Sequence, residues 1–365
     1  STYQYYFKKT KIAGTLHYQH AAFSSDYAFP YARKTETSFD NLTYSVVANI
    51  NANRNNTLKF NASGRTSNPR ATDLQGIVNT TNRQNVFAGN PGLDPVYTHR
   101  LSGQYIRANP AKGRTFTVSA EATASPNTIT DSLVIDSPDF VIDDEGTKLG
   151  EGNQFTKPVN LPGYWSLRAS VNYGMPVRWL RSNLNFRAGI STGRIPSIIN
   201  GERNFLNNNV YNAGLTLGSN ISEAVDFRLS YTGRYNVSRS SSEVRTLDNT
   251  YFSETTFVLW KRLVLRANAD YNYYRGITDT FLEERLICNA MLGVKLFRNC
   301  LGEASVGVND ILDQNGTTFR RTVSGTTLRN VTNLAVGRYV SFQFTYNLRL
   351  FRRQSNAVMD ALQGK

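Results

Sequence analysis

The chain contains a long stretch near its end in which apolar and polar side chains alternate without a break. It runs from Val340 to Phe351 and reads VSFQFTYNLRLF. Successive side chains of a strand point to opposite faces, so one face of such a strand is apolar and the other forms hydrogen bonds. Strands of globular proteins usually have about 5–6 residues, whereas a tilted strand that crosses a bilayer needs about 9–11. The stretch therefore predicts a strand of a transmembrane β-barrel.

Composition alone does not separate a membrane barrel from a soluble protein. The 365 residues have a mean hydropathy of −0.41, and no segment approaches the roughly 18 consecutive apolar residues of a transmembrane helix. A transmembrane barrel is also hydrophilic on average, because only every second strand residue meets lipid. The aromatic share of 12% suits barrel girdles and soluble β-proteins alike. The choice between a membrane barrel and a soluble protein therefore depends on the periodicity of apolar residues along the chain.

The charge and the cysteines narrow the functional classes. The net charge is +14, but the basic residues are scattered singly through predicted strands and turns, which argues against nucleic-acid binding. The field of such a surface favours anionic solutes or lipid head groups. Cys288 and Cys300 are expected to be unpaired, because a disulfide scaffold has more cysteines with regular spacing. No signal peptide is visible at Ser1, so we expect an export signal that was removed or lies upstream.

Fourteen alternating runs are found along the chain, and they predict an all-β, antiparallel, up-and-down transmembrane barrel. The runs span approximately 1–20, 39–50, 57–66, 97–108, 114–125, 163–173, 182–191, 208–219, 226–237, 248–259, 263–273, 284–297, 303–312 and 338–351.

The predicted connections alternate between short and long. Short connections fall at about 51–56, 109–113, 174–181, 220–224, 260–262 and 298–302. Long connections fall at about 21–38, 67–96, 126–162, 192–207, 238–247, 274–283 and 313–337. Outer-membrane barrels have short periplasmic turns and longer external loops, whereas a soluble β-sandwich has no reason to sort its loops by end. With this parity, Ser1 begins an upward strand and both ends of the chain lie on the periplasmic side.

The polar faces of the predicted strands carry charged residues. Each would cost about 2–4 kcal/mol in hydrocarbon at mid-depth, so we expect them to face a wet lumen or a plug. The candidates are Glu121, Arg168, Arg187, Arg228, Arg234, Arg266, Asp270, Lys295 and Arg349.

Metal and catalytic sites find little support in the sequence. His17 and His20 are three apart on a predicted strand and face opposite sides, so they do not share a metal easily. The loop 136–151 is rich in carboxylates, including Asp143, Asp144 and Glu145, and oxygen-rich loops can hold calcium. It lacks the alternate-position spacing of a calcium loop, so a solvated acidic loop is the favoured interpretation, with calcium binding left open. We expect no cofactor and no enzymatic activity.

Three motifs resemble one family. Residues 85–98 (NVFAGNPGLDPVYT) are similar to the GNP-x-L-x-P signature of Bacteroidota-type TonB-dependent-receptor barrels. Residues 308–315 (VNDILDQN) resemble the family's DILNQN segment before the closing strand, and residues 336–346 (VGRYVSFQFTY) resemble its closing LGRY segment. Order and spacing match, although Val96 stands where the family usually has Glu. The motif residues, to which we assign structural roles, are Gly89, Asn90, Pro91, Leu93, Pro95, Asp310, Asn315, Gly337, Arg338 and Tyr339.

The resemblance implies an organisation larger than this chain. Receptors of the family have 22-stranded barrels around a plug that contacts TonB, and no segment here resembles that plug. The expectation is that residues 1–351 form the C-terminal portion of a receptor barrel in outer-membrane lipid, and that 352–365 form a periplasmic tail. TonB would act through a plug outside this chain, and a surface lipoprotein is a further expected partner.

Two kinds of function therefore remain open. The leading hypothesis is outer-membrane transport, in which a TonB-dependent-receptor-like barrel takes up a bulky nutrient through a plugged pore. The alternative is a passive porin-like or structural barrel that acts as a subunit of a surface assembly. Loop shape decides ligand identity, and the sequence does not reveal that shape.

Overall fold

The computed structural model describes residues 2–7, 9–27, 33–142, 146–219, 221–222, 224–240, 242–276, 281–297, 300–315, 318–324, 327–332 and 336–347. Nearly all regular structure in them is strand. The helical elements are α1 (Ala71–Leu74) and the short 3-10 turns η1 (Pro110–Lys112) and η2 (Arg178–Leu180). No helix of these residues is long and apolar enough to cross a bilayer.

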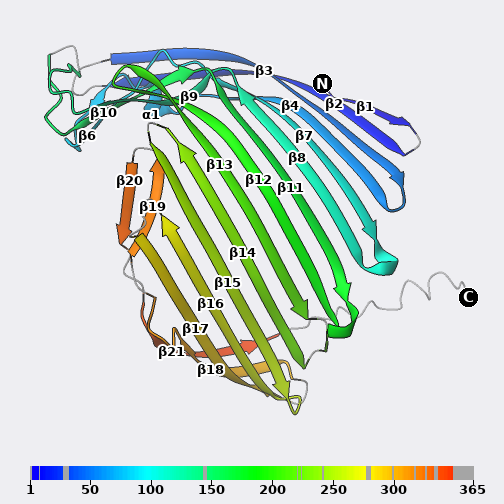
Figure 1. The fold of residues 1–365 in the computed structure, drawn as a ribbon. Helices are drawn as coiled ribbons and strands as arrows, with labels where there is room; N and C mark the ends of the chain where they lie inside the picture. The colour runs from blue at the N-terminus through cyan, green and yellow to red at the C-terminus, as the bar shows by residue number, and fades with distance from the viewer. Residues whose placement is uncertain are drawn as a thin grey trace, which may run out of the picture.

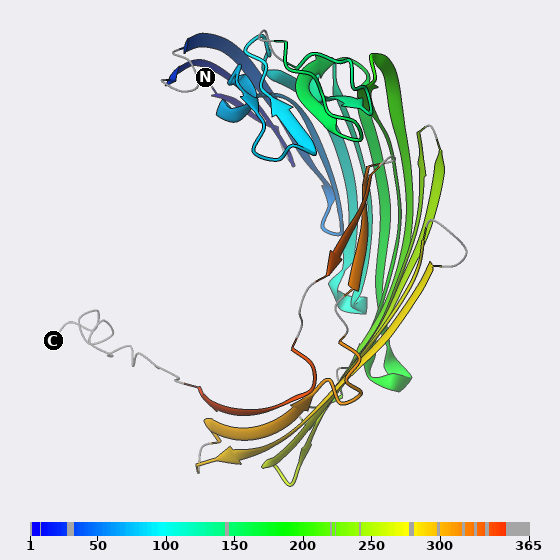
Figure 2. The same ribbon diagram turned by 90° about the vertical axis from the view of Figure 1, so that its left-hand side faces the viewer.

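A wall of fifteen neighbouring antiparallel strands forms most of a nineteen-stranded sheet. In spatial order it consists of β1 (Thr2–Phe7), β2 (Thr10–Tyr27), β3 (Arg33–Asn53), β4 (Asn56–Ser67), β7 (Val96–Asn109), β8 (Arg114–Ser125), β11 (Tyr164–Val177), β12 (Ser182–Ile199), β13 (Glu202–Ser219), β14 (Val225–Arg239), β15 (Glu243–Leu259), β16 (Leu263–Gly276), β17 (Phe281–Leu296), β18 (Gly302–Asn309) and β21 (Tyr339–Tyr346). The wall curves into an open trough (Figures 1 and 2). Among the described residues, no pairing joins β1 to β21, so the sheet is not closed.

Two insertions lie at the end of the wall where the longest connections are. The outer-loop subdomain comprises α1, β5 (Val78–Asn79), β6 (Asn85–Ala88), β9 (Thr128–Ile135) and β10 (Gln154–Leu161), in which β6 and β10 pair in parallel. Figure 2 shows this subdomain on the concave side of the trough. The strands β19 (Thr318–Ser324) and β20 (Thr327–Thr332) form a separate hairpin.

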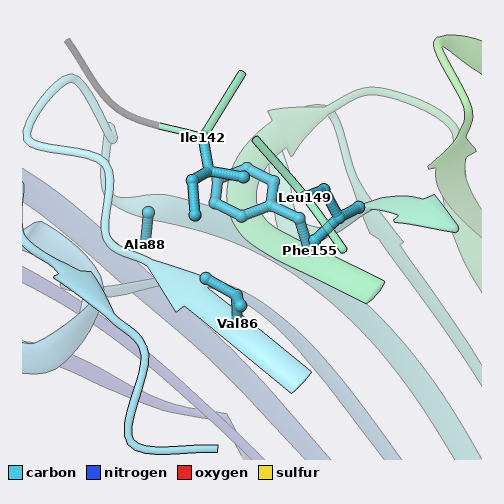
Figure 3. Close-up of a cluster of buried hydrophobic side chains, with 5 residues drawn as sticks. All are labelled: Val86, Ala88, Ile142, Leu149 and Phe155. Carbon is cyan, nitrogen blue, oxygen red and sulfur yellow. The ribbon is translucent and has the colours of Figure 1, made fainter. Parts of the chain in front are cut away.

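A small hydrophobic core lies in the outer-loop subdomain. Figure 3 shows Phe155 of β10 packed with Val86 and Ala88 of β6 and with Ile142 and Leu149 of the β9–β10 connection. All five side chains are buried, which distinguishes them from the half-exposed apolar residues of the wall. The subdomain is therefore a packed unit.

The predicted strand for residues 1–20 is wrong in one respect. The structure divides this run into the hairpin β1–β2, in which Phe7 pairs with Thr10 and Thr2 with Thr15. Both halves alternate, so periodicity shows no break, and the two residues between Phe7 and Thr10 lack the Asn-Gly type of signal that marks tight hairpins. The prediction that Ser1 begins an upward strand is therefore also wrong, because β1 runs antiparallel to β2.

Four predicted long loops are instead mostly strand. β12 and β13 pair as far as Ile199 and Glu202, joined by Asn200 and Gly201. Both of these residues have positive φ, 49° and 80°, as a tight type I′ hairpin requires. The segment 21–38 likewise belongs largely to β2 and β3, and the segments 238–247 and 274–283 belong largely to β14–β17. The connections that remain long are 68–95, 126–163 and 310–338, and we take their end of the wall as the outer end.

The register assigns the side chains of the wall to two faces. In one row Ala120, Ala169 and Ile190 stand opposite one another, and in the next row Glu121 and Arg168 do so. Near the outer end, polar side chains on the second face are buried, namely Asn41, Ser63, Thr123 and Ser125. Since the outer-loop subdomain covers the concave side, the polar face is the concave one and the apolar face is convex (Figure 2).

The convex face has the pattern expected of a surface in contact with lipid. Aromatic side chains form chains of contacts across neighbouring strands, such as Tyr231–Tyr251–Tyr271 with ring centroids 5.0 and 5.9 Å apart. At the opposite end, Trp179 and Trp260 protrude from short turns and are each 83% exposed. Aromatic girdles of this kind mark the interfaces of outer-membrane barrels.

Candidate functional site

The concave polar face is the candidate site, and Arg168 lies near its centre. Its guanidinium is 3.8 Å from the Glu121 carboxylate, which stands directly opposite in register. Glu121 is also 3.8 Å from Arg100 on β7. One carboxylate is therefore shared by two arginines on the two strands that flank it.

Two further candidate arginines form ion pairs across the concave face. Arg228 on β14 donates a 2.8 Å hydrogen bond to Glu254, its register partner on β15. Arg266 on β16 forms a two-pronged ion pair with Glu303 on β18, two strands away. Lys295 stands directly opposite Glu303 on the intervening strand. The basic side chains of this region thus alternate with carboxylates.

The other candidates have polar neighbours. Arg187 donates from Nε to the Asn172 side-chain oxygen at 2.9 Å. Arg234 stands opposite Asp248 in register. Asp270 accepts a 2.7 Å hydrogen bond from Asn272. Arg349 lies outside the described residues, as do the tail 352–365 and the acidic residues 143–145.

Alternation along one strand identified this face but did not reveal the partners on it. The sequence did not predict three residues that complete the ion pairs, namely Arg100, Glu254 and Glu303. Which residues stand opposite one another depends on the register between strands, and the turns set that register. For Arg228 and Glu254, counting back from their common β14–β15 hairpin could have provided the signal.

A shallow groove crosses the middle of this face. Its volume is about 620 Å³, and small side chains form much of its floor. Ser119 and Ser170 share a 2.8 Å hydrogen bond there, next to Gly189. The Glu121–Arg168 pair borders the same groove. Its lining can accept and donate hydrogen bonds and carries charges of both signs.

The motif at residues 89–95 connects the wall to the outer-loop subdomain. The Asn90 side chain donates to the Pro158 carbonyl at 3.0 Å and accepts from the Gly92 amide at 3.1 Å, while the Asn90 amide donates to the Asp73 carbonyl. A Cβ on Gly89 would lie 2.0 Å from the Gln75 carbonyl oxygen. Close backbone approach therefore requires glycine at this position.

The same motif is held to two other segments by asparagines. Asn160 of β10 exchanges hydrogen bonds of 2.9 and 3.0 Å with the backbone of Asp94. Asn127, at the β8–β9 turn, donates to the Pro95 carbonyl and accepts from the Tyr97 amide. Leu93 is 2% exposed between these contacts. Residues 90–97 thus hold the connections 68–95 and 126–163 to the start of β7.

The second and third motifs meet at the outer end of β18. Asp310 is 3% exposed, and its carboxylate accepts from the amides of Gln314 and Asn315 at 3.0 and 2.9 Å. Asp313 accepts from the Arg338 amide at 2.9 Å, and a Cβ on Gly337 would lie 2.7 Å from its carboxylate oxygen. These contacts hold the connection close to the beginning of β21.

One carboxyl of the outer-loop subdomain has an altered proton affinity. The desolvating surroundings of β9 and the nearby Asp73 carboxylate raise the pKa of Asp131 above its usual value, even though part of the side chain reaches solvent. Two carboxylates do not make a metal site. The described part of the chain brings together no group of three or more His, Cys, Asp or Glu side chains suited to a metal, and Cys288 and Cys300 are free.

Comparisons with known proteins agree with this geometry. The model of the outer membrane protein beta-barrel family matches residues 2–346. A solved structure, described as the FrpB iron transporter from Neisseria meningitidis (F3-3 variant), superposes with a TM-score of 0.52 at 11% sequence identity, over 93% of this chain and 52% of that one. The chain thus spans about half the length of that structure, and the likeness concerns the fold. No curated protein matches.

Family membership sets the cellular location as well as the fold. The matched region covers every described strand, so the description applies to the whole wall and not to one motif. The convex apolar face then contacts lipid of the outer membrane and the concave face looks inward. The chain belongs to the outer membrane protein beta-barrel family.

Proposed function

We propose that the chain forms part of the wall of a TonB-dependent-receptor-like barrel that takes up a bulky nutrient through a plugged pore. The observation that carries the proposal is the open edge on each side of a wall that already has fifteen strands. A strand edge cannot remain unpaired in hydrocarbon, so β1 and β21 require further strands as partners. The completed barrel then has sixteen strands or more, and a barrel of about 22 strands is wide enough for its lumen to hold a plug.

The concave face supports passage of a polar solute and not of small anions alone. Arg168, Arg228 and Arg266 each have a carboxylate partner, so much of the positive charge on this face is balanced. This balance removes the main argument for an anion-selective passive pore. Hydrogen-bonding groups of both kinds suit a large polar cargo such as a metal chelate, an oligosaccharide or a peptide.

Energy-dependent uptake is the test of this proposal. Cells carrying the complete native protein, cells lacking it and cells without the TonB motor are supplied with mixtures of metal chelates, oligosaccharides and peptides. We expect depletion of one bulky solute class from the medium only when both the protein and the motor are present. Depletion that continues without the motor, together with steady conductance of small ions by the purified protein, would contradict the proposal and support a passive pore.

A further inference from the structure

The convex face carries a cluster of arginines at its outer end that transport through the lumen does not use. The arginine belt consists of Arg194 on β12, Arg239 on β14, Arg245 on β15 and Arg275 on β16. Register places all four on the apolar face: Arg194 stands opposite Trp165, Arg245 opposite Val237, and Arg275 opposite Leu247. Four cations on neighbouring strands therefore point toward the membrane side.

The depth of the belt corresponds to a membrane surface. Tyr211 and Tyr235 stack 6.3 Å apart on the same face, two to four residues closer to the inner end than Arg245 and Arg239. At about 3.3 Å per residue, Arg245 and Arg239 lie roughly 7 and 13 Å along the strands from Tyr235, whereas Arg275 stands level with it. Tyrosine rings sit at the head-group level of a bilayer, so guanidinium groups just beyond them meet lipid head groups.

The guanidinium groups differ in how they are engaged. Arg194 stacks on the Phe205 ring, 3.4 Å from its centroid, and its Nε is buried without a hydrogen-bond partner. Arg239 and Arg245 both contact the single carboxylate of Glu243 and are 59% and 63% exposed. One carboxylate cannot neutralise two arginines. Arg239, Arg245 and Glu243 together therefore keep a net positive charge, and both arginines are accessible to a ligand.

On β2 and β3, the outer rim of the convex face carries paired acidic and basic side chains in place of a cluster of arginines. On β2 and β3, Asp40 pairs with His20 at 2.8 Å, and Lys34 is paired with Glu36. Asp26 stands opposite Lys34 in register. Among the described residues of β2 and β3, basic side chains of the convex rim are thus matched by carboxylates, whereas on β14 and β15 two arginines share one carboxylate.

We propose that the arginine belt docks the phosphorylated head group of an outer-leaflet glycolipid. Guanidinium is always charged and presents a planar fork that matches phosphate oxygens in a bidentate manner. Tyr211 and Tyr235 provide apolar contact for the part of the lipid below the phosphate. Charge complementarity and depth together favour a lipid phosphate over a soluble anion, because the apolar rings extend the site toward the bilayer.

Native mass spectrometry of the complete protein, purified from outer membranes, measures how much lipid it retains. The same method then measures binding of three added probes, which are bisphosphorylated lipid A, its dephosphorylated form and inorganic phosphate. The triple variant Arg194→Gln/Arg239→Gln/Arg245→Gln is compared with Arg178→Gln/Arg181→Gln/Lys261→Gln, which removes the same charge from the inner turns. We expect bisphosphorylated lipid A binding to fall by roughly tenfold or more only in the first variant, given the contribution of each cation near an anionic surface.

A second variant separates binding from folding. Glu243→Gln removes the carboxylate that competes for two guanidinium groups, so we expect it to retain more bisphosphorylated lipid A than the native protein does. A merely structural Glu243 would instead leave retention unchanged or reduce it. The proposal is overturned if the belt variant retains as much lipid as the inner-turn variant. It is also overturned if dephosphorylated lipid A binds equally well, or if inorganic phosphate displaces the lipid completely.

Discussion

At the scale of single residues, the motif positions show how a few side chains hold a long outer connection to the wall. Gly89, Asn90 and Asp310 lie where a long outer connection meets the wall, and each satisfies or makes room for backbone groups. Buried backbone donors without partners cost about 1–3 kcal/mol each, so such positions are sensitive to small changes. The sequence identified these residues through a resemblance, and the structure adds the atoms that they contact.

Gly89→Ala tests the close approach between the motif and the end of α1. The added Cβ would lie 2.0 Å from a backbone carbonyl, and we expect overpacking to destabilise the outer-loop subdomain by roughly 1–3 kcal/mol. Faster cleavage of the outer connections by external protease in intact cells would report it. Gly92→Ala is the matched control, because its nearest neighbour would be a side-chain oxygen at 3.4 Å. Equal cleavage rates for the two variants would contradict this role of Gly89.

Asp310→Ala tests the anchor before the closing strand. It leaves the amides of Gln314 and Asn315 without their acceptor, and we expect a loss of about 1–3 kcal/mol per buried donor. Urea unfolding of the barrel in detergent measures the change. The exposed Asp313, which accepts from Arg338, provides the comparison as Asp313→Ala, for which a smaller loss is expected. A larger loss for Asp313→Ala would contradict the anchor.

At the scale of elements, strand identity was predictable and strand ends were less so. A period of two over ten or more residues indicates a membrane strand wherever it occurs, and β7, β8, β11 and β16 match their predicted runs closely. The tops of β12 and β13 were missed because polar residues on both faces beyond the membrane weaken the alternation. The β1–β2 hairpin was missed because its turn has no sequence signal.

Neighbouring residues on β11 test the assignment of faces. Ala169 stands between Ala120 and Ile190 on the convex face, and Ala169→Arg would cost about 2–4 kcal/mol near mid-depth. Ser170 lies on the concave face beside Gly189, in the open groove, so Ser170→Arg is expected to fold. Heat-modifiability on gels measures the folded fraction. Similar folded fractions for both variants would show that the two faces have been assigned incorrectly.

At the scale of the whole molecule, the ion pairs are the part of the site that the sequence could not reveal. Arg266 and Glu303 are 37 residues apart and meet across two strands, which depends on the registers of β16 with β17 and of β17 with β18. The alternating pattern predicted that Arg266 faces inward, but it identified neither Glu303 nor the pairing of the two residues. The curvature and the open edges of the wall were likewise visible only in three dimensions (Figure 2).

The two faces of the wall are expected to meet different surroundings, with water along the concave polar face and lipid along the convex face. A cysteine scan along β11, from residue 165 to residue 173, tests this expectation most directly in outer membranes that contain the complete protein, with Cys288 and Cys300 replaced by serine. We expect a membrane-impermeant maleimide to label positions 166, 168, 170 and 172. Positions 167, 169 and 171 should stay unlabelled and respond to lipid-phase quenchers. Uniform labelling along the strand, or the reverse alternation, would contradict it.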